Sequence, residues 1–255
     1  MKKKIVAVIL CGGMGSRISQ ITRMIPKSLI KVNQRPIIWY VVASLLKNGV
    51  REIIFPLGYK GKRIEIFVKK KFKKESRYFQ FHDTGEKTEI HNSIKKIIKN
   101  LKNYKDFILI NSDTIFDFNL RNFINLHQKK KHLISLSGIK MESSWGTIVK
   151  NKKNLLKKFV INAQIEDYKI KKYAGFNCYR NTGISIINSK CLNYIKNLDH
   201  NFEISLYNKF VKYNKVGVKI FNKFWYPIET LKDLNILNQD KTKKKKINLI
   251  KQKLS

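Results

Sequence analysis

Apolar residues follow two patterns along the chain, and their alternation predicts a sheet built from β-α-β units. Short runs rich in β-branched residues are typical of buried strands, whereas longer segments carry apolar residues at helical spacing. In the first half, strands are predicted at 4–10, 51–58, 77–83 and 105–113, and helices at 36–49, 61–72 and 91–101. This order is typical of an α/β fold with a largely parallel sheet.

The second half of the chain is less regular. Strands are predicted at 132–140, 146–151, 183–188, 216–221 and 224–228, and helices at 202–214 and 229–239. The sequence shows no internal repeat and no linker rich in Pro, Gly and Ser. We therefore interpret residues 1–240 as a single domain with a mixed, mostly parallel sheet flanked by helices. Residues 241–255 form a basic tail, which we expect to be a frayed, solvated terminus.

Composition narrows the possible partners. With 255 residues and 43% hydrophobic content the chain can bury a large core. The net charge of +37 suggests nucleic acid as a possible partner. However, the lysines are scattered along the sequence and no stacking motif accompanies them, so we interpret them as a solvated, charged surface. No run approaches the roughly 20 apolar residues of a membrane span. The three cysteines lack metal or disulfide spacing, and we expect a cytoplasmic protein.

The stretch CGGMGSR at 11–17 allows two interpretations. A lysine-rich start and an apolar run before Cys11 are features of an export signal with a lipid-acceptor cysteine. That run is shorter than the roughly 7 to 15 residues of such a signal, and Leu10 is not a small residue. The alternative is a strand that delivers a glycine loop to a phosphate, with Arg17 adding a fork of donors. We favour the phosphate loop.

Other polar residues follow predicted strands at the same edge of the sheet, where ligands bind in open α/β folds. Asp113 ends one strand, with Asp117 close behind it, and Glu229 follows the aromatic strand. Each could be a turn or helix cap. Beside a phosphate loop, however, a carboxylate is placed to hold Mg²⁺ against a nucleotide. Lys27 is expected to return to the same phosphates.

No set of residues fits a covalent nucleophile, and the five histidines are dispersed along the chain. The predicted chemistry is therefore a cationic phosphate cradle with a carboxylate-bound metal. Such a site suits phosphoryl or nucleotidyl transfer, in which positioning and charge neutralisation supply most of the rate.

Five stretches in order resemble the motifs of the sugar-1-phosphate nucleotidyltransferases: VILCGGMGSR, IPKSLIKVNQRPIIWYVV, LINSDTIFDFNL, WGTIVKN and NTGISIIN. HDTGEKTEIHNSIKKI and FWYPIETLKDLN are similar to segments of glucose-1-phosphate cytidylyltransferases. The resemblance implies a Rossmann-like (GT-A-like) fold and a Mg²⁺-dependent reaction. In it a sugar-1-phosphate attacks the α-phosphate of a nucleoside triphosphate, here CTP, and pyrophosphate leaves. It also implies a role in making surface polysaccharide precursors, and such enzymes are often homo-oligomers.

The resemblance assigns roles residue by residue. The catalytic residues are Arg17 and Lys27; the nucleotide-binding residues are Leu10, Gly12, Gly13, Gly15, Ser16, Asn92 and Asp113; the acceptor-binding residues are Trp145, Gly146, Lys169, Asn181 and Gly183; and the metal ligands are Asp113 and Glu229.

Some positions depart from the family pattern. Ser28 and Ser112 replace a proline and a glycine of two motifs, and His91-Asn92 replaces a glycine pair beside the base, where Asn92 could bond a pyrimidine edge. The family's FxEKP lysine has no clean match, and Lys169 is the substitute we assign. Three alternatives therefore stay open: guanylyl transfer to heptose-1-phosphate, a non-sugar phosphate as acceptor, and a catalytically silent nucleotide-binding domain.

Overall fold

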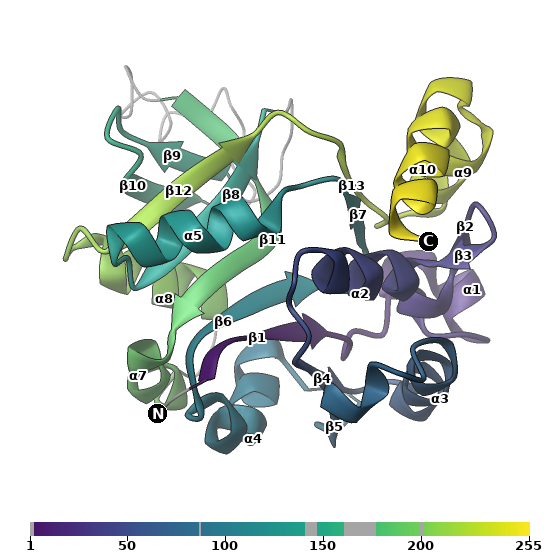
Figure 1. The fold of residues 1–255 in the computed structure, drawn as a ribbon, viewed down its shortest axis with the longest axis horizontal. Coiled ribbons are helices and arrows are strands. Elements are labelled where there is room, and N and C mark those ends of the chain that lie inside the picture. The colour runs from purple at the N-terminus through teal and green to yellow at the C-terminus, as the bar shows by residue number, and fades with distance from the viewer. Residues whose placement is uncertain (1–2, 87, 141–146, 161–176, 199–200) are drawn as a thin grey trace.

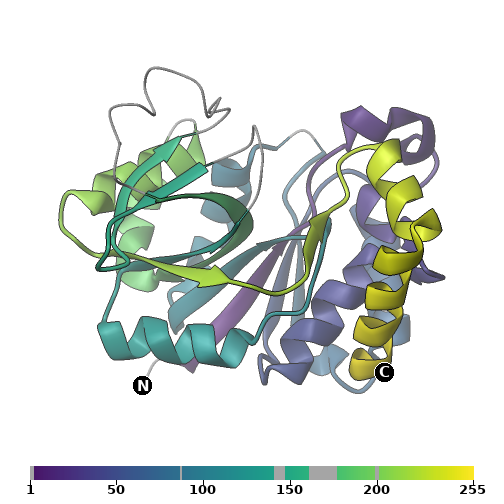
Figure 2. The ribbon, with the colours of Figure 1, turned by 90° about the horizontal axis from the view of Figure 1, so that it is seen from above.

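Helices cover both faces of a central mixed sheet (Figures 1 and 2). The computed structural model describes residues 3–86, 88–140, 147–160, 177–198 and 201–255. The sheet has nine strands within these residues and runs in the order β10-β9-β11-β6-β1-β4-β5, with β8 and β12 joined through β11. The predicted mixed, mostly parallel α/β fold is confirmed.

The strands of the large sheet are β1 Lys3–Leu10, β4 Ile53–Leu57, β5 Phe79–Asp83, β6 Tyr104–Asn111, β8 Ile134–Ile139, β9 Thr147–Lys150, β10 Leu156–Val160, β11 Asn177–Asn188 and β12 Val216–Phe221. Two small sheets pair β2 Lys31–Val32 with β3 Arg35–Pro36 and β7 Thr114–Phe116 with β13 Trp225–Pro227. The helices are α1 Ser19–Thr22, α2 Ile37–Lys47, α3 Gly61–Lys71, α4 Ile90–Leu101, α5 Leu120–Lys130, α7 Leu192–Lys196, α8 Phe202–Val211, α9 Leu231–Gln239 and α10 Lys241–Leu254.

Strands β6, β1, β4 and β5 form the parallel half of the sheet. Both faces of β1, β4 and β6 are covered, which explains why these three strands read as apolar runs in the sequence, whereas β5, at the end of the sheet, alternates apolar and polar residues. In β1, Ala7 and Ile9 join the core beneath α2, α3 and α10, whereas Val6 and Val8 join the core beneath α4, α7 and α8. All four side chains have no exposed surface. Parallel pairing also brings the carboxyl ends of β1, β4 and β6 to one edge.

Strand β11 joins the parallel half to the antiparallel half. Its residues 184–188 pair with β6, and its residues 177–180 pair with β9. The register against β8 shifts between Asn181 and Ser185. Gly183, at this irregularity, has a φ of 72°, a left-handed conformation that glycine adopts without steric cost. The strand therefore bends beside the end of β6, next to the edge where the sequence places ligands.

The C-terminal segment differs from its prediction. Residues 241–255 were expected to be a frayed, solvated tail, and that expectation is wrong, because Lys241–Leu254 forms helix α10. Ile247 and Ile250 are buried in the core that α2 also lines. Figures 1 and 2 show α10 lying alongside α2 at the edge of the molecule. The lysine-rich composition concealed a narrow apolar stripe that is sufficient to dock the helix.

Within the described residues, no helix is both long and apolar enough to cross a membrane.

Candidate active site

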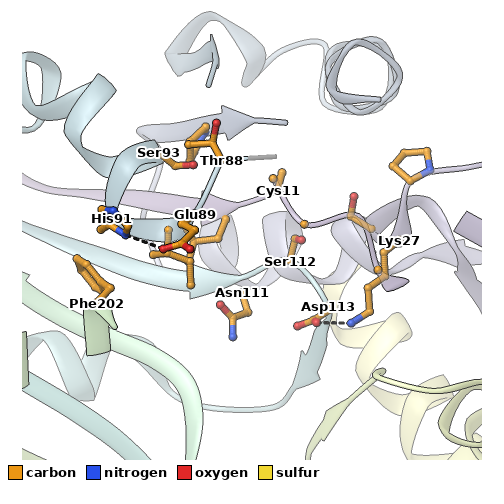
Figure 3. A pocket seen from close by; sticks show the side chains of 18 of the residues that line it. Cys11, Lys27, Thr88, Glu89, His91, Ser93, Asn111, Ser112, Asp113 and Phe202 are labelled. Carbon is orange, nitrogen blue, oxygen red and sulfur yellow. Dashed lines mark hydrogen bonds and ion pairs between the residues drawn. The ribbon is translucent and has the colours of Figure 1, made fainter. Parts of the chain in front are cut away.

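A cavity of about 600 Å³ opens at the carboxyl ends of β1, β4 and β6. The first residues of α4 and α8 complete its wall. Figure 3 shows Lys27 and Asp113 on one side of this cavity and His91 with Phe202 on the other. Six residues predicted from the sequence line it: Leu10, Gly12, Gly13, Gly15, Lys27 and Asp113.

The conformation of the glycine loop after β1 is supported by hydrogen bonds at Gly15 and by packing against Gly58. Gly15 has a φ of 64° and accepts hydrogen bonds at its carbonyl from the Ile18 amide at 3.0 Å and from the Thr22 hydroxyl at 3.2 Å. A Cβ on Gly58 would lie 2.7 Å from Gly12, so the loop after β4 packs directly against the backbone of this loop. In contrast, a Cβ on Gly13 would meet nothing within 4 Å. The loop is therefore supported from behind and open towards the cavity.

Lys27 and Asp113 form the most prominent charge pair of the cavity. Lys27 Nζ lies 2.6 Å from Asp113 Oδ2, and the two side chains are only 18% and 25% exposed. Lys27 opens a short 3-10 helix after Pro26, and its side chain packs against the glycine loop near Gly15. Limited exposure reduces screening by water, so the charge of Lys27 acts more strongly within the cavity than the charge of a surface lysine would. The sequence predicted both residues at this edge.

A backbone hydrogen bond places Glu229 close to the pair formed by Lys27 and Asp113. The Ile228 amide donates a hydrogen bond of 2.8 Å to the Asp113 carbonyl, which holds the end of β13 against the end of β6. Glu229 lies 3.3 Å from Arg17 Nη1 and 3.6 Å from Arg180 Nη2. Burial raises the pKa of Glu229, and Arg180 and Arg17 oppose that shift. Two arginines therefore hold this carboxylate in place.

Thr230, the residue after Glu229, has a structural role at the start of the next helix. Thr230 caps α9 and forms a reciprocal capping box with Asp233. Since Thr230 and Asp233 satisfy the helix end, Glu229 is left to pair with the two arginines. Arg180 itself is buried, and its guanidinium lies 4.9 Å from the centre of the Trp225 ring. No motif or strand end marks this arginine in the sequence, because it lies within β11.

Asp113 and Glu229 offer donors of the kind that Mg²⁺ prefers. Both are carboxylates with limited exposure, at 25% and 22% of the side chain. The part of the chain that the structure describes contains no group of three or more acidic, His or Cys side chains able to hold an ion. Mg²⁺ is commonly bound by one or two carboxylates together with substrate phosphates and water. The donor set therefore fits an ion that arrives with a nucleotide.

The cavity is also lined by residues to which the sequence analysis assigned no role. Asn111, Phe202 and Glu203 line it, together with His91. His91, which replaces a glycine of the family pattern, is buried and lines the cavity, and its Nδ1 lies 3.2 Å from Glu89 Oε2. Two predicted acceptor residues stand behind Glu203 and Asn111. Asn181 contacts Glu203, and a Cβ on Gly183 would lie 2.5 Å from the Asn111 amide nitrogen.

Other predicted residues lie away from the cavity. Ser16 and Asn92 are exposed, and the cavity is lined by the neighbours of Asn92, His91 and Ser93. Arg17 is 53% exposed at its side chain and pairs with Glu229. The placement of Asn92 gives no support to a contact with the base. Trp145, Gly146 and Lys169 lie outside the described residues.

Cys11 has a structural role, which agrees with interpreting residues 11–17 as a phosphate loop. It is buried at the end of β1, and burial raises the pKa of its thiol to about 12. A thiol with such a pKa is not a nucleophile at neutral pH. The cavity therefore offers cations, carboxylates and backbone amides.

Comparison with known proteins gives the family. The model of the nucleotidyl transferase family matches residues 6–244. The chain belongs to that family. The predicted resemblance is thereby confirmed, and the cavity of this nucleotidyl transferase lies where the family motifs converge.

Individual relatives are more distant. The nucleotidyl transferase is 28% identical to a protein of Bacillus subtilis (strain 168) described as a probable glucose-1-phosphate cytidylyltransferase, over 91% of this chain and 94% of that protein. It is 32% identical to the D-glycero-alpha-D-manno-heptose 1-phosphate guanylyltransferase of Campylobacter jejuni, over 49% of this chain and 54% of that protein. Its fold matches a provisionally assigned glucose-1-phosphate thymidylyltransferase from Bacillus anthracis with a TM-score of 0.79 and 19% identity, covering 92% of this chain and 94% of that one.

Proposed function

We propose that the protein joins a nucleoside triphosphate, CTP, to a sugar-1-phosphate and releases pyrophosphate, and that the reaction depends on Mg²⁺. The observation that carries the proposal is the Lys27–Asp113 pair at 2.6 Å, set against a glycine loop whose outer face is open. A cation and a carboxylate at the carboxyl edge of a parallel sheet match the needs of a bound triphosphate.

The residues divide the work of the reaction. Gly12 and Gly13 line the cavity, and their amides would take phosphate oxygens, as backbone amides in glycine loops do. Lys27 would neutralise charge at the α-phosphate while the acceptor oxygen attacks in line. Arg17, at the rim, would bind the leaving pyrophosphate. No side chain has to act as a covalent nucleophile, because positioning and charge neutralisation supply the rate.

Asp113 and Glu229 are the residues that would hold Mg²⁺. The ion would neutralise phosphate charge and orient the triphosphate. Lys27, which pairs with Asp113, would then be released to contact phosphate oxygens. Arg17 and Arg180 keep Glu229 oriented towards the end of β6.

The identity of the base rests on the relatives rather than on a contact in the cavity. The Bacillus subtilis relative, matched over almost the whole chain, supports CTP. Guanylyl transfer to heptose-1-phosphate is the second candidate, because the Campylobacter jejuni guanylyltransferase matches about half of the chain at a higher identity. Asn92 is exposed and supports neither base.

Pyrophosphate release tests the proposal. The protein is incubated with Mg²⁺, each of the four NTPs and a panel of neutral and acidic sugar-1-phosphates, with and without EDTA. We expect release with CTP and one neutral sugar-1-phosphate, and its loss on chelation. Selective release with GTP would replace CTP by the second candidate. The absence of release with every pair would reject the enzyme and leave a nucleotide-binding domain.

A further inference from the structure

The carboxyl end of α1 is held by two side chains from another helix. Lys60 Nζ donates hydrogen bonds to the Arg23 carbonyl and, at 3.4 Å, to the Thr22 carbonyl. Arg63 Nη1 donates to the Met24 carbonyl at 2.5 Å. Carbonyls at the end of a helix have no partner within the helix, so these three accept hydrogen bonds from two cations instead. Both cations lie at the start of α3, and Figure 1 shows α1 and α3 at the same side of the molecule.

The same two cations are placed unfavourably for α3 itself. Lys60 is the N-cap of α3 and Arg63 lies in its first turn, which contains no acidic residue. The N-terminus of a helix carries a partial positive charge, so cations there lower its stability. Lys60 also has a φ of 53°, a left-handed conformation that is uncommon for a residue with a side chain. The hydrogen bonds to α1 offset these costs, and backbone strain of this kind occurs frequently at functional sites.

Thr22 connects this anchoring to the glycine loop. Its hydroxyl group donates to the Gly15 carbonyl at 3.2 Å, whereas its own carbonyl accepts from Lys60. A Cβ on Gly15 would lie 2.9 Å from Thr22 Cγ2 and 3.3 Å from Lys27 Cβ, so the backbone of Gly15 packs against both side chains. Met24 is 72% exposed, and its side chain contributes little burial at this end of α1. The positions of Gly15 and Lys27 therefore depend on the hydrogen bonds that hold α1.

We propose that Lys60 and Arg63 are positioning residues for the nucleotide, because by holding the end of α1 they keep Gly15 and Lys27 in the geometry that a triphosphate requires. The inference rests on the proposed function, since it concerns the glycine loop and the lysine of the same cavity. Neither Lys60 nor Arg63 lines that cavity, so each acts through α1 and not by touching phosphate. A displacement of about 1 Å in positioning groups can lower turnover about 100-fold, so modest hydrogen bonds are effective at this place.

Hydrogen exchange tests the anchoring without reference to activity. In Lys60→Met and in Arg63→Met, we expect the amides of residues 16–25 to exchange about fivefold faster than in the wild type, because each variant loses hydrogen bonds that hold this segment. Lys62→Met is the matched control. It removes the same charge from the start of the same helix, and its partner Glu65 keeps a second lysine. Unchanged exchange of residues 16–25 in all three variants would overturn the proposal.

Steady-state kinetics test the consequence for the nucleotide. With the substrates that the wild type uses, we expect Lys60→Met and Arg63→Met each to raise the nucleotide KM about fivefold and to leave the acceptor KM constant. Lys60→Arg keeps a donor and should restore most of the loss. Lys62→Met should change neither KM. An equal rise of the nucleotide KM in Lys62→Met would overturn the proposal, because it would indicate long-range attraction of the nucleotide by any nearby cation.

The outcomes separate the two proposals. A wild-type protein that releases no pyrophosphate with any pair rejects the proposed function, and the exchange of residues 16–25 then decides alone whether Lys60 and Arg63 hold α1. An active wild type, with a nucleotide KM that is the same in Lys60→Met and Arg63→Met as in Lys62→Met, rejects the positioning role alone. Faster exchange across the whole chain would also reject it, because that result indicates general destabilisation.

Discussion

At the scale of single residues, Glu203 and Glu229 are two acidic side chains of the cavity region whose charged forms are disfavoured by burial. Burial raises the pKa of both. Glu229 is compensated by Arg17 and Arg180, whereas Glu203 is stabilised by neutral hydrogen-bond donors. Desolvation without a counter-charge lowers stability.

That difference makes the stability of Glu203→Gln depend on pH. The folded-state pKa of Glu203 lies above its ordinary value of 4.5. Its carboxyl group therefore contributes stability that is fully present below the unfolded pKa and is lost as pH rises through the folded pKa. The variant does not titrate, so we expect it to be more stable than the wild type at pH 7, by an amount that shrinks towards pH 4.5. Urea unfolding across this range measures the difference, and a variant that is less stable at pH 7 would show that Glu203 is structural.

Residue-scale prediction from sequence succeeded where local motifs carry the signal. Lys27 and Asp113 were expected at the cavity, and the structure brings them into contact. Glu203 could not be found in this way. It lies at the start of an ordinary amphipathic helix, and only the bend of β11 brings Asn181 to it. The spacing of residues along the chain gives no indication of the contact between Asn181 and Glu203.

At the scale of elements, helix α10 shows that amino-acid composition alone does not predict whether a segment folds. Its residues include the run KTKKKK, typical of a solvated terminus, yet Asp240 caps the helix by accepting a hydrogen bond from the Lys243 amide. Ile250 faces the core, whereas its neighbour Leu249 is 48% exposed. Lys253 also pairs with Asp117 at 2.6 Å. The helical periodicity of its apolar residues, rather than its charge, determines that this segment folds as a helix on the core.

These two neighbours provide a matched test of docking. Ile250→Ala removes buried methyl groups and should lower the free energy of unfolding by about 3 kcal/mol, within the range for buried aliphatic side chains. Leu249→Ala should change it by less than about 0.5 kcal/mol, since that side chain is largely in water. Urea denaturation of the full chain gives both values. Equal, small effects would mean that the segment is a frayed tail after all.

At the scale of the whole molecule, the site is a product of sheet topology. The glycine loop, Asp113 and Glu229 come from three segments that are far apart in the sequence, and parallel pairing of β1 with β6 brings the first two to one edge. β13 adds the third through its pairing with β7. The sequence predicts most of the parallel half because β1, β4 and β6 are buried apolar runs. The path of β11 was less predictable, since one strand serves three partners.

The most direct test of nucleotidyl transfer at the Lys27–Asp113 site is pyrophosphate release by Lys27→Met, with the nucleotide and acceptor that the wild type uses. We expect turnover to fall by about 100-fold or more, as it does when one group that stabilises transition-state charge is removed. Lys62→Met, at a side chain that is 77% exposed, should keep wild-type turnover. Undiminished release by Lys27→Met, with folding unchanged, would place the chemistry elsewhere and contradict the assignment of this cavity.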